Sequence, residues 1–172
     1  MARYGSTILS QATQLSGVPS GTTVNGYIGY LGAASGCGFR LRRLHLGTRI
    51  STGGVPTSQQ VGIGVYRQTV APSGTGIAAA VAGVAFETWT PADPTAGLFA
   101  TTATTIGTTG PTIGANAIST PTFNTQSAVD VPWEFTEEII VGTGTTNGIA
   151  FVILGGTLPT NHQVSLTVEW EV

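Results

Sequence analysis

The stretch His162–Val172 reads HQVSLTVEWEV. Apolar and polar residues alternate along it, as they do in a β-strand whose successive side chains leave opposite faces of a sheet. We therefore expect a strand whose Val168 and Trp170 are buried between two sheets. The alternating polar residues, among them Glu169 and Glu171, should lie on the outward face of that strand.

The composition of the 172-residue chain favours strands over helices. It contains 25 Gly and 9 Pro among many Thr and β-branched residues, a mixture typical of strands and turns. The mass of 17.5 kDa suits one domain. We predict an all-β fold, an antiparallel β-sandwich, with a jelly roll favoured by the long connections. The predicted parts are an extended N-terminal arm at 1–23, with few apolar anchors and mobile in the free subunit, and a single sandwich domain at 24–172.

Other strand patterns precede the final one. In 37–49 the apolar phase slips at Arg42 and Arg43, which predicts a β-bulge. Pro132 in the strand pattern at 128–135 indicates an edge position. Further strands are predicted within 25–35, 60–69, the second half of 77–90, 137–141 and 149–154, with one or two short strands inside 91–125. The Ala-rich first half of 77–90 fits a short helix or a strand.

Charged residues make up 8% of the chain, against a usual share of about a quarter. A surface with so few charges favours association with partners, so we expect a homo-oligomer. The formal net charge of −2 gives no general attraction to nucleic acid or to an anionic membrane, and neither is expected as a partner.

All six basic residues are arginines, and guanidinium groups pair well with carboxylates. Every Arg lies between positions 3 and 67, and every Asp or Glu lies between 87 and 172. This separation permits ion pairs between two halves of the fold or between subunits, and the sequence leaves both open. The candidate partner-binding residues are Arg3, Tyr4, Arg40, Arg42, Arg43 and Arg49.

The chain shows none of the familiar catalytic motifs, such as a nucleophile elbow or a phosphate-binding loop. Glu169 and Glu171 have a spacing of roughly 6.5–7 Å along a strand, near that of carboxylate pairs in glycosidases, but a solvated strand face is the better interpretation. Cys37 is expected to be a small packed residue. We predict no enzyme, no catalytic residue, no cofactor and no metal site.

The stretches VDVPWEFTEEIIVGTGTTNGIAFVILGG (129–156) and HQVSLTVEWEV (162–172) carry a family resemblance. They resemble the C-terminal strands of small jelly-roll virion proteins of tailed bacteriophages, the head decoration (cement) or minor capsid proteins. In these the final strand tends to close on a Trp flanked by acids, as Glu169-Trp170-Glu171 does here.

The resemblance implies a non-enzymatic subunit that is made in the host cytoplasm and located in the virion. It would bind the outer face of an assembled head, with the major capsid protein or other virion subunits as partners, often as a trimer. A tail, baseplate or receptor-binding subunit is one alternative, and a lectin-like glycan-binding module is another. For sugar binding, the loose aromatic candidates are Trp89, Tyr66 and Tyr27.

Overall fold

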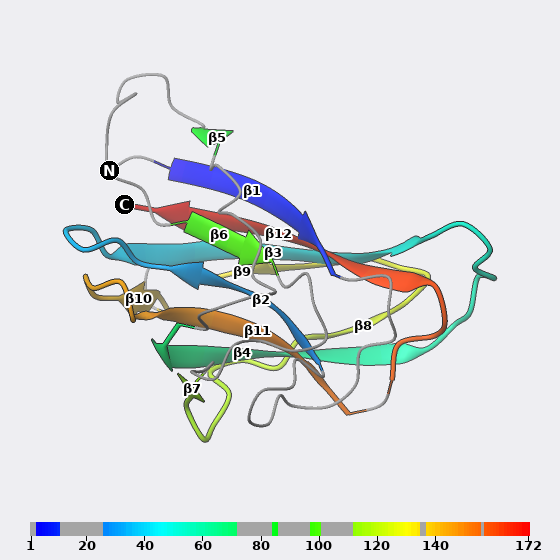
Figure 1. Cartoon of the computed structure of the whole chain (residues 1–172). Coiled ribbons are helices and arrows are strands. Elements are labelled where there is room, and N and C mark those ends of the chain that lie inside the picture. Colours follow the sequence, from blue (N-terminus) through cyan, green and yellow to red (C-terminus); the bar gives the residue numbers. More distant parts are fainter. Residues whose placement is uncertain are drawn as a thin grey trace.

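The computed structural model describes residues 3–10, 26–71, 84–85, 97–100, 112–134, 137–155 and 157–172 (Figure 1). The strands are β1 (Arg3–Leu9), β2 (Tyr27–Gly32), β3 (Phe39–Ile50), β4 (Gln60–Val70), β5 (Val84–Ala85), β6 (Gly97–Ala100), β7 (Thr112–Ile113), β8 (Thr122–Asn124), β9 (Val129–Pro132), β10 (Ile139–Val141), β11 (Gly148–Leu154) and β12 (His162–Glu171). Within these residues no helix is long and apolar enough to cross a membrane.

The strands form two antiparallel sheets that lie as two layers in Figure 1. Sheet one has the order β10-β3-β12-β1-β5, and β9 also pairs with β3. Sheet two has the order β6-β2-β11-β4-β7, and β8 also pairs with β4. The predicted all-β class and the antiparallel sandwich are therefore confirmed.

The pairing between strands is nested along the chain. β1 pairs with β12, and β2 pairs with β11. β3 pairs with β9 and β10, while β4 pairs with β7 and β8. Most of the residues that connect these strands lie outside the described ranges, so the jelly-roll connectivity stays a prediction.

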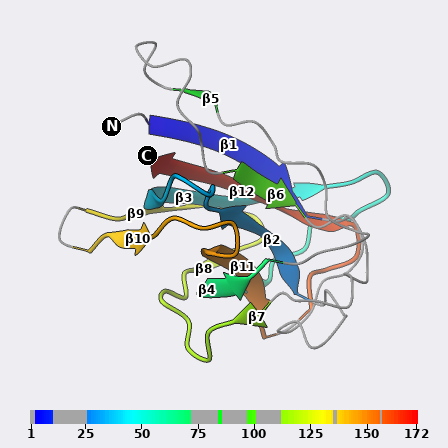
Figure 2. The same cartoon turned by 60° about the vertical axis from the view of Figure 1, so that its left-hand side comes forward.

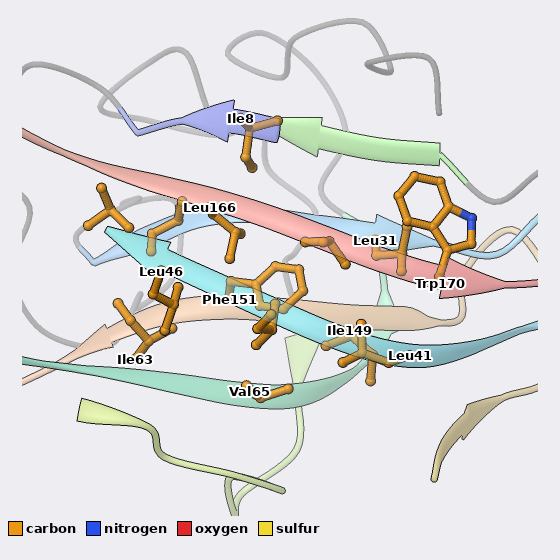
Figure 3. Packing of buried hydrophobic residues seen from close by; sticks show 14 of the residues in the cluster. Ile8, Leu31, Leu41, Leu46, Ile63, Val65, Ile149, Phe151, Leu166 and Trp170 are labelled. Atoms are coloured by element: carbon orange, nitrogen blue, oxygen red, sulfur yellow. The ribbon is translucent and has the colours of Figure 1, made fainter. Parts of the chain in front are cut away.

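The main core fills the space between the sheets (Figure 3). β11, the middle strand of sheet two, is buried on both faces, as its unbroken apolar sequence predicts. The large core side chains labelled in Figure 3 are Ile8, Leu41, Leu46, Leu166 and Trp170 from sheet one, and Leu31, Ile63, Val65, Ile149 and Phe151 from sheet two.

The final strand occupies the middle of sheet one, between β1 and β3. Val168 and Trp170 are both 0% exposed, and the Trp170 ring stacks on Tyr4 with centroids 6.1 Å apart. Glu169 and Glu171 lie on the opposite face, where they are only partly buried. The predicted orientation of this strand is therefore confirmed.

The prediction of an extended N-terminal arm is wrong for Arg3–Leu9, the strand that the structure describes there. Arg3–Leu9 forms β1, which pairs with β12 along its whole length. Tyr4 and Ile8 are buried in the core. The small residues Gly5 and Ser6 interrupt the apolar alternation that would have revealed this strand. Residues 11–25, including the predicted boundary of the arm, lie outside the described part.

The predicted minor strands agree with the structure where it describes them. β9, which contains Pro132, pairs with β3 alone among the described strands, so the proline lies in an edge strand (Figure 2). Inside 91–125, where one or two short strands were expected, the described residues form three, namely β6, β7 and β8. β5 provides a two-residue strand in the second half of 77–90, and the Ala-rich first half lies outside the described residues.

A second apolar cluster covers the outer face of sheet two. It comprises Tyr27, Tyr30, Tyr66, Ala150 and Val152. With Tyr27 at 0% and Tyr66 at 8% exposure, neither ring is offered to a sugar, and this part of the prediction is wrong. The third aromatic candidate, Trp89, lies outside the described residues.

The Tyr27 hydroxyl is buried and donates a hydrogen bond of 3.2 Å to Oε1 of Gln68. Burial raises the pKa of Tyr27 well above its ordinary value, and the neighbouring Tyr30 raises it further. The structure therefore holds Tyr27 in its neutral form.

Replacing Trp170 tests the core around the final strand. We expect Trp170→Ala to lower the free energy of unfolding by about 3–5 kcal/mol, because it leaves a cavity between the sheets. The outward Ser165→Ala on the same strand should change it by less than about 0.5 kcal/mol. Urea unfolding of both variants provides the measurement, and equal losses would contradict the buried position of Trp170.

Alkaline unfolding tests the buried Tyr27. Because the pKa of Tyr27 is raised in the folded protein, its contribution to stability is present below the ordinary tyrosine pKa of about 10 and is lost as the pH rises further. Tyr27→Phe should cost about 1–3 kcal/mol at neutral pH by leaving Gln68 without this partner. Above about pH 10 the variant should lose stability less steeply than the wild type. Parallel pH profiles of urea unfolding with the same slope would count against this account.

Candidate functional site

A hollow of about 470 Å³ crosses sheet one on its outer face. Its lining includes Arg3 and Glu171, which pair with each other where β1 begins and β12 ends. Figure 1 shows these two strand ends side by side. A hollow of this size accommodates a small molecule or a short piece of a polymer. Its lining consists of Arg3, Arg42, Arg43, Pro132, Trp133, Glu134 and Glu171.

The predicted β-bulge in β3 shapes this site and is confirmed. Arg43 pairs with Glu169 and Leu41 pairs with Trp170, so Arg42 is the extra residue in β3. A bulge of this kind re-aims side chains and increases the local twist of a strand. Here it keeps Leu41 in the core while Arg42 reaches acids on the outer face of the sheet.

The strands that pair with the edge of β3, β9 and β10, are interrupted beside Arg42. β9 pairs with β3 from Arg43 onward, and β10 pairs with β3 up to Leu41. The backbone N–H of Trp133 donates a 2.9 Å hydrogen bond to the carbonyl of Arg42. The interruption between β9 and β10 therefore brings Trp133 and Glu138 to the bulge.

Arg42 is the buried centre of the charged cluster, with 6% of its side chain exposed. Its Nε donates to Oε2 of Glu171 at 2.6 Å, and Nη2 donates to the same oxygen. Its Nη1 donates to Oε1 of Glu138 at 2.6 Å. Burial lowers the pKa of Arg42, but the hydrogen bonds and charges of Glu171 and Glu138 outweigh burial and raise the pKa overall. Arg42 is therefore a buried cation held by two carboxylates.

The other arginines of the cluster are held more loosely. Arg3 and Arg43 lie 4.0 and 3.9 Å from the carboxylate oxygens of Glu169, and 50% and 46% of their side chains are exposed. Arg43 is also 3.4 Å from Asp130. Each guanidinium has five N–H donors, and these long contacts use few of them. Arg3 and Arg43 thus keep donors available at the edge of the hollow.

The structure separates the six predicted partner-binding residues. Arg3, Arg40, Arg42 and Arg43 gather in one cluster and pair with acids of the same chain, which is one of the two arrangements that the sequence left open. Tyr4 is buried in the core, where its ring stacks on Trp170. Arg49, near the other end of β3, is exposed and has no ion pair with any described residue.

Four residues of the site were not predicted as site residues from the sequence, namely Pro132, Trp133, Glu134 and Glu138. Trp133 was assigned only to a strand pattern, and the two glutamates were counted only as members of the acidic half. The bulge in β3 indicates only that the strand paired beside it is disturbed, and it does not indicate which residues of that strand lie there.

The described residues were also compared with the requirements of a metal site, a reactive cysteine and a catalytic carboxylate pair. No group of three His, Cys, Asp or Glu could hold a metal ion among them. Cys37 is buried, as predicted, and its thiol donates to the carbonyl of Gly38. Glu169 and Glu171, whose spacing resembled a carboxylate pair, each contact an arginine.

The fold and site define an antiparallel β-sandwich with a charged, aromatic-walled hollow on one sheet. Comparisons of the chain with protein-family models, with curated proteins and with solved structures found no match.

Removing Arg42 tests the buried cluster. Arg42→Ala should lower the free energy of unfolding by about 3–5 kcal/mol, because Glu171 and Glu138 would lose their shared cation. Arg43→Ala, which breaks only exposed contacts, should cost about 0–1 kcal/mol. Urea unfolding distinguishes the two, and similar losses for both variants would show that Arg42 is not the centre of the cluster.

Proposed function

We propose that the protein is a non-enzymatic structural subunit of a virion, a decoration subunit that binds the outer face of an assembled phage head. The observation that carries the proposal is the nested pairing of the strands. The first strand pairs with the last and the second with the second-last, and this order supports a jelly roll. A fold alone does not define a function. The resemblance of residues 129–172 to phage virion proteins supplies the second support.

The distribution of charge supports an assembly role. Four of the six arginines are paired with acids at one end of sheet one, so they do little to make the remaining surface hydrophilic. A surface low in charge favours contacts between subunits. We propose a homo-oligomer, with a trimer around one axis as the favoured form.

We place the contact with a neighbouring virion subunit at the connection between β3 and β4. Arg49 is exposed there without an ion pair to a described residue. Ile50, the next residue in the chain, and Val55, in the connection that follows, are 36% and 73% exposed, although they are large apolar residues. A cation next to exposed apolar side chains suits an acidic and partly apolar surface of another subunit.

Two measurements test the virion assignment. Mass spectrometry of particles purified from the source of this sequence should find the chain at a fixed copy number, and cryo-electron microscopy should place it on the head. Light scattering of the isolated protein should give three times the mass of 17.5 kDa. A location on the tail would favour the tail or baseplate alternative, and a monomer at every concentration would contradict the oligomer.

Charge reversal tests the proposed contact. Arg49→Glu should lower the occupancy of particles by about threefold or more, equivalent to ~0.6 kcal/mol, because it places an acid against an acidic partner. Arg43→Gln, six residues before Arg49 in β3, is the control and should leave occupancy unchanged. Equal occupancy for Arg49→Glu and the wild type would remove Arg49 from the contact.

A further inference from the structure

The charges around the hollow nearly balance. Four arginines contribute positive charge, and five carboxylates in and next to the lining contribute negative charge. A charged ligand of either sign would meet about as many like charges as opposite ones, so Coulomb attraction favours neither. The cluster consists of Arg3, Arg40, Arg42, Arg43, Asp130, Glu134, Glu138, Glu169 and Glu171. A neutral ligand is the better match for such a site.

The hollow presents hydrogen-bond donors and acceptors side by side. Arg3 and Arg43 offer guanidinium N–H donors, and both side chains are about half exposed. Glu134 is exposed and offers carboxylate acceptors. A hydroxyl group both donates and accepts, so a ligand with many hydroxyl groups can satisfy this alternation without carrying a charge.

One wall of the hollow is apolar. Trp133 and Pro132 line it, and Trp133 is partly buried against the main core. Because the backbone N–H of Trp133 donates a hydrogen bond to the carbonyl of Arg42, Trp133 is held at a fixed place beside the bulge. A Trp combines a large flat contact surface with one N–H donor, which suits a ligand that is apolar on its ring face and polar at its edge.

We propose that this hollow binds a neutral glycan through one or two pyranose rings. The ring face packs on Trp133, and the hydroxyl groups bond to Arg3, Arg43 and Glu134. Pockets of about 300–1,000 Å³ hold small molecules, and the 470 Å³ of this hollow suits one or two sugar rings. This binding site goes beyond the proposed assembly role and does not depend on it.

The test uses a panel of neutral oligosaccharides with α- and β-linked glucose, galactose, mannose and N-acetylglucosamine. N-acetylneuraminic acid and a glutamate-rich peptide serve as anionic comparison ligands. Isothermal titration calorimetry and saturation-transfer NMR on the intact protein should show saturable binding of at least one neutral member. Transfer should be strongest at the ring C–H protons, since those protons face the indole.

Variants locate the binding. Trp133→Ala should weaken it at least about tenfold, which is the loss of ~1.4 kcal/mol, and Trp133→Phe should retain part of the affinity. Because Trp133 packs on the core, Glu134→Gln provides a second variant at an exposed position, with an expected loss of about threefold. Glu137→Gln, an exposed neighbour outside the lining, is the control and should bind as the wild type does.

Three outcomes would overturn the proposal. Failure of every neutral oligosaccharide to bind removes the glycan site. Binding of the anionic ligands alone identifies an acidic partner instead. Unchanged sugar affinity in Glu134→Gln and Trp133→Phe places the binding elsewhere on the protein. None of these outcomes affects the particle and oligomer measurements, so the glycan site and the virion role are tested independently.

Discussion

The hydrogen bonds of Arg42 to two carboxylates connect parts of the chain that are far apart in sequence. Glu138 and Glu171 are 96 and 129 residues away from Arg42, and each contact joins a different segment to β3. A buried guanidinium is costly without charge partners. The bulge therefore requires both the end of β12 and the approach to β10 to lie where they do, and the hollow follows from that arrangement.

The same strands carry the core on one face and the charges on the other. In β12, Trp170 points between the sheets while Glu169 and Glu171, on either side of it, reach the arginines. Apolar burial there contributes about 1.5–3 kcal/mol for each large side chain, whereas exposed ion pairs contribute at most about 1 kcal/mol. The core thus sets the stability of sheet one, and the outer charges set which groups meet at its surface.

Features of the fold that depend on neighbouring residues could be predicted from the sequence, whereas contacts between residues far apart in the sequence could not. Strict alternation identified β12, and the phase slip in 37–49 located the bulge at Arg42, because both are local properties of a strand. β1 was missed because Gly5 and Ser6 weaken its pattern and its partner lies at the other end of the chain. The meeting of Glu138 and Trp133 with Arg42 was also beyond the sequence, since it depends on how three strands align.

Neutralisation of the arginines links stability to the chemistry of the hollow. Glu138, Glu169 and Glu171 hold Arg42 and its neighbours in place, and the same carboxylates cancel the positive charge that would otherwise attract anions. What they leave at the surface is a set of hydrogen-bonding groups with little net charge beside the indole of Trp133. A cation without an ion pair to a described residue is found instead at Arg49, near the opposite end of β3. The two regions of the long strand therefore differ in charge: the arginines near the bulge are neutralised by acids, whereas Arg49 has no ion pair with a described residue.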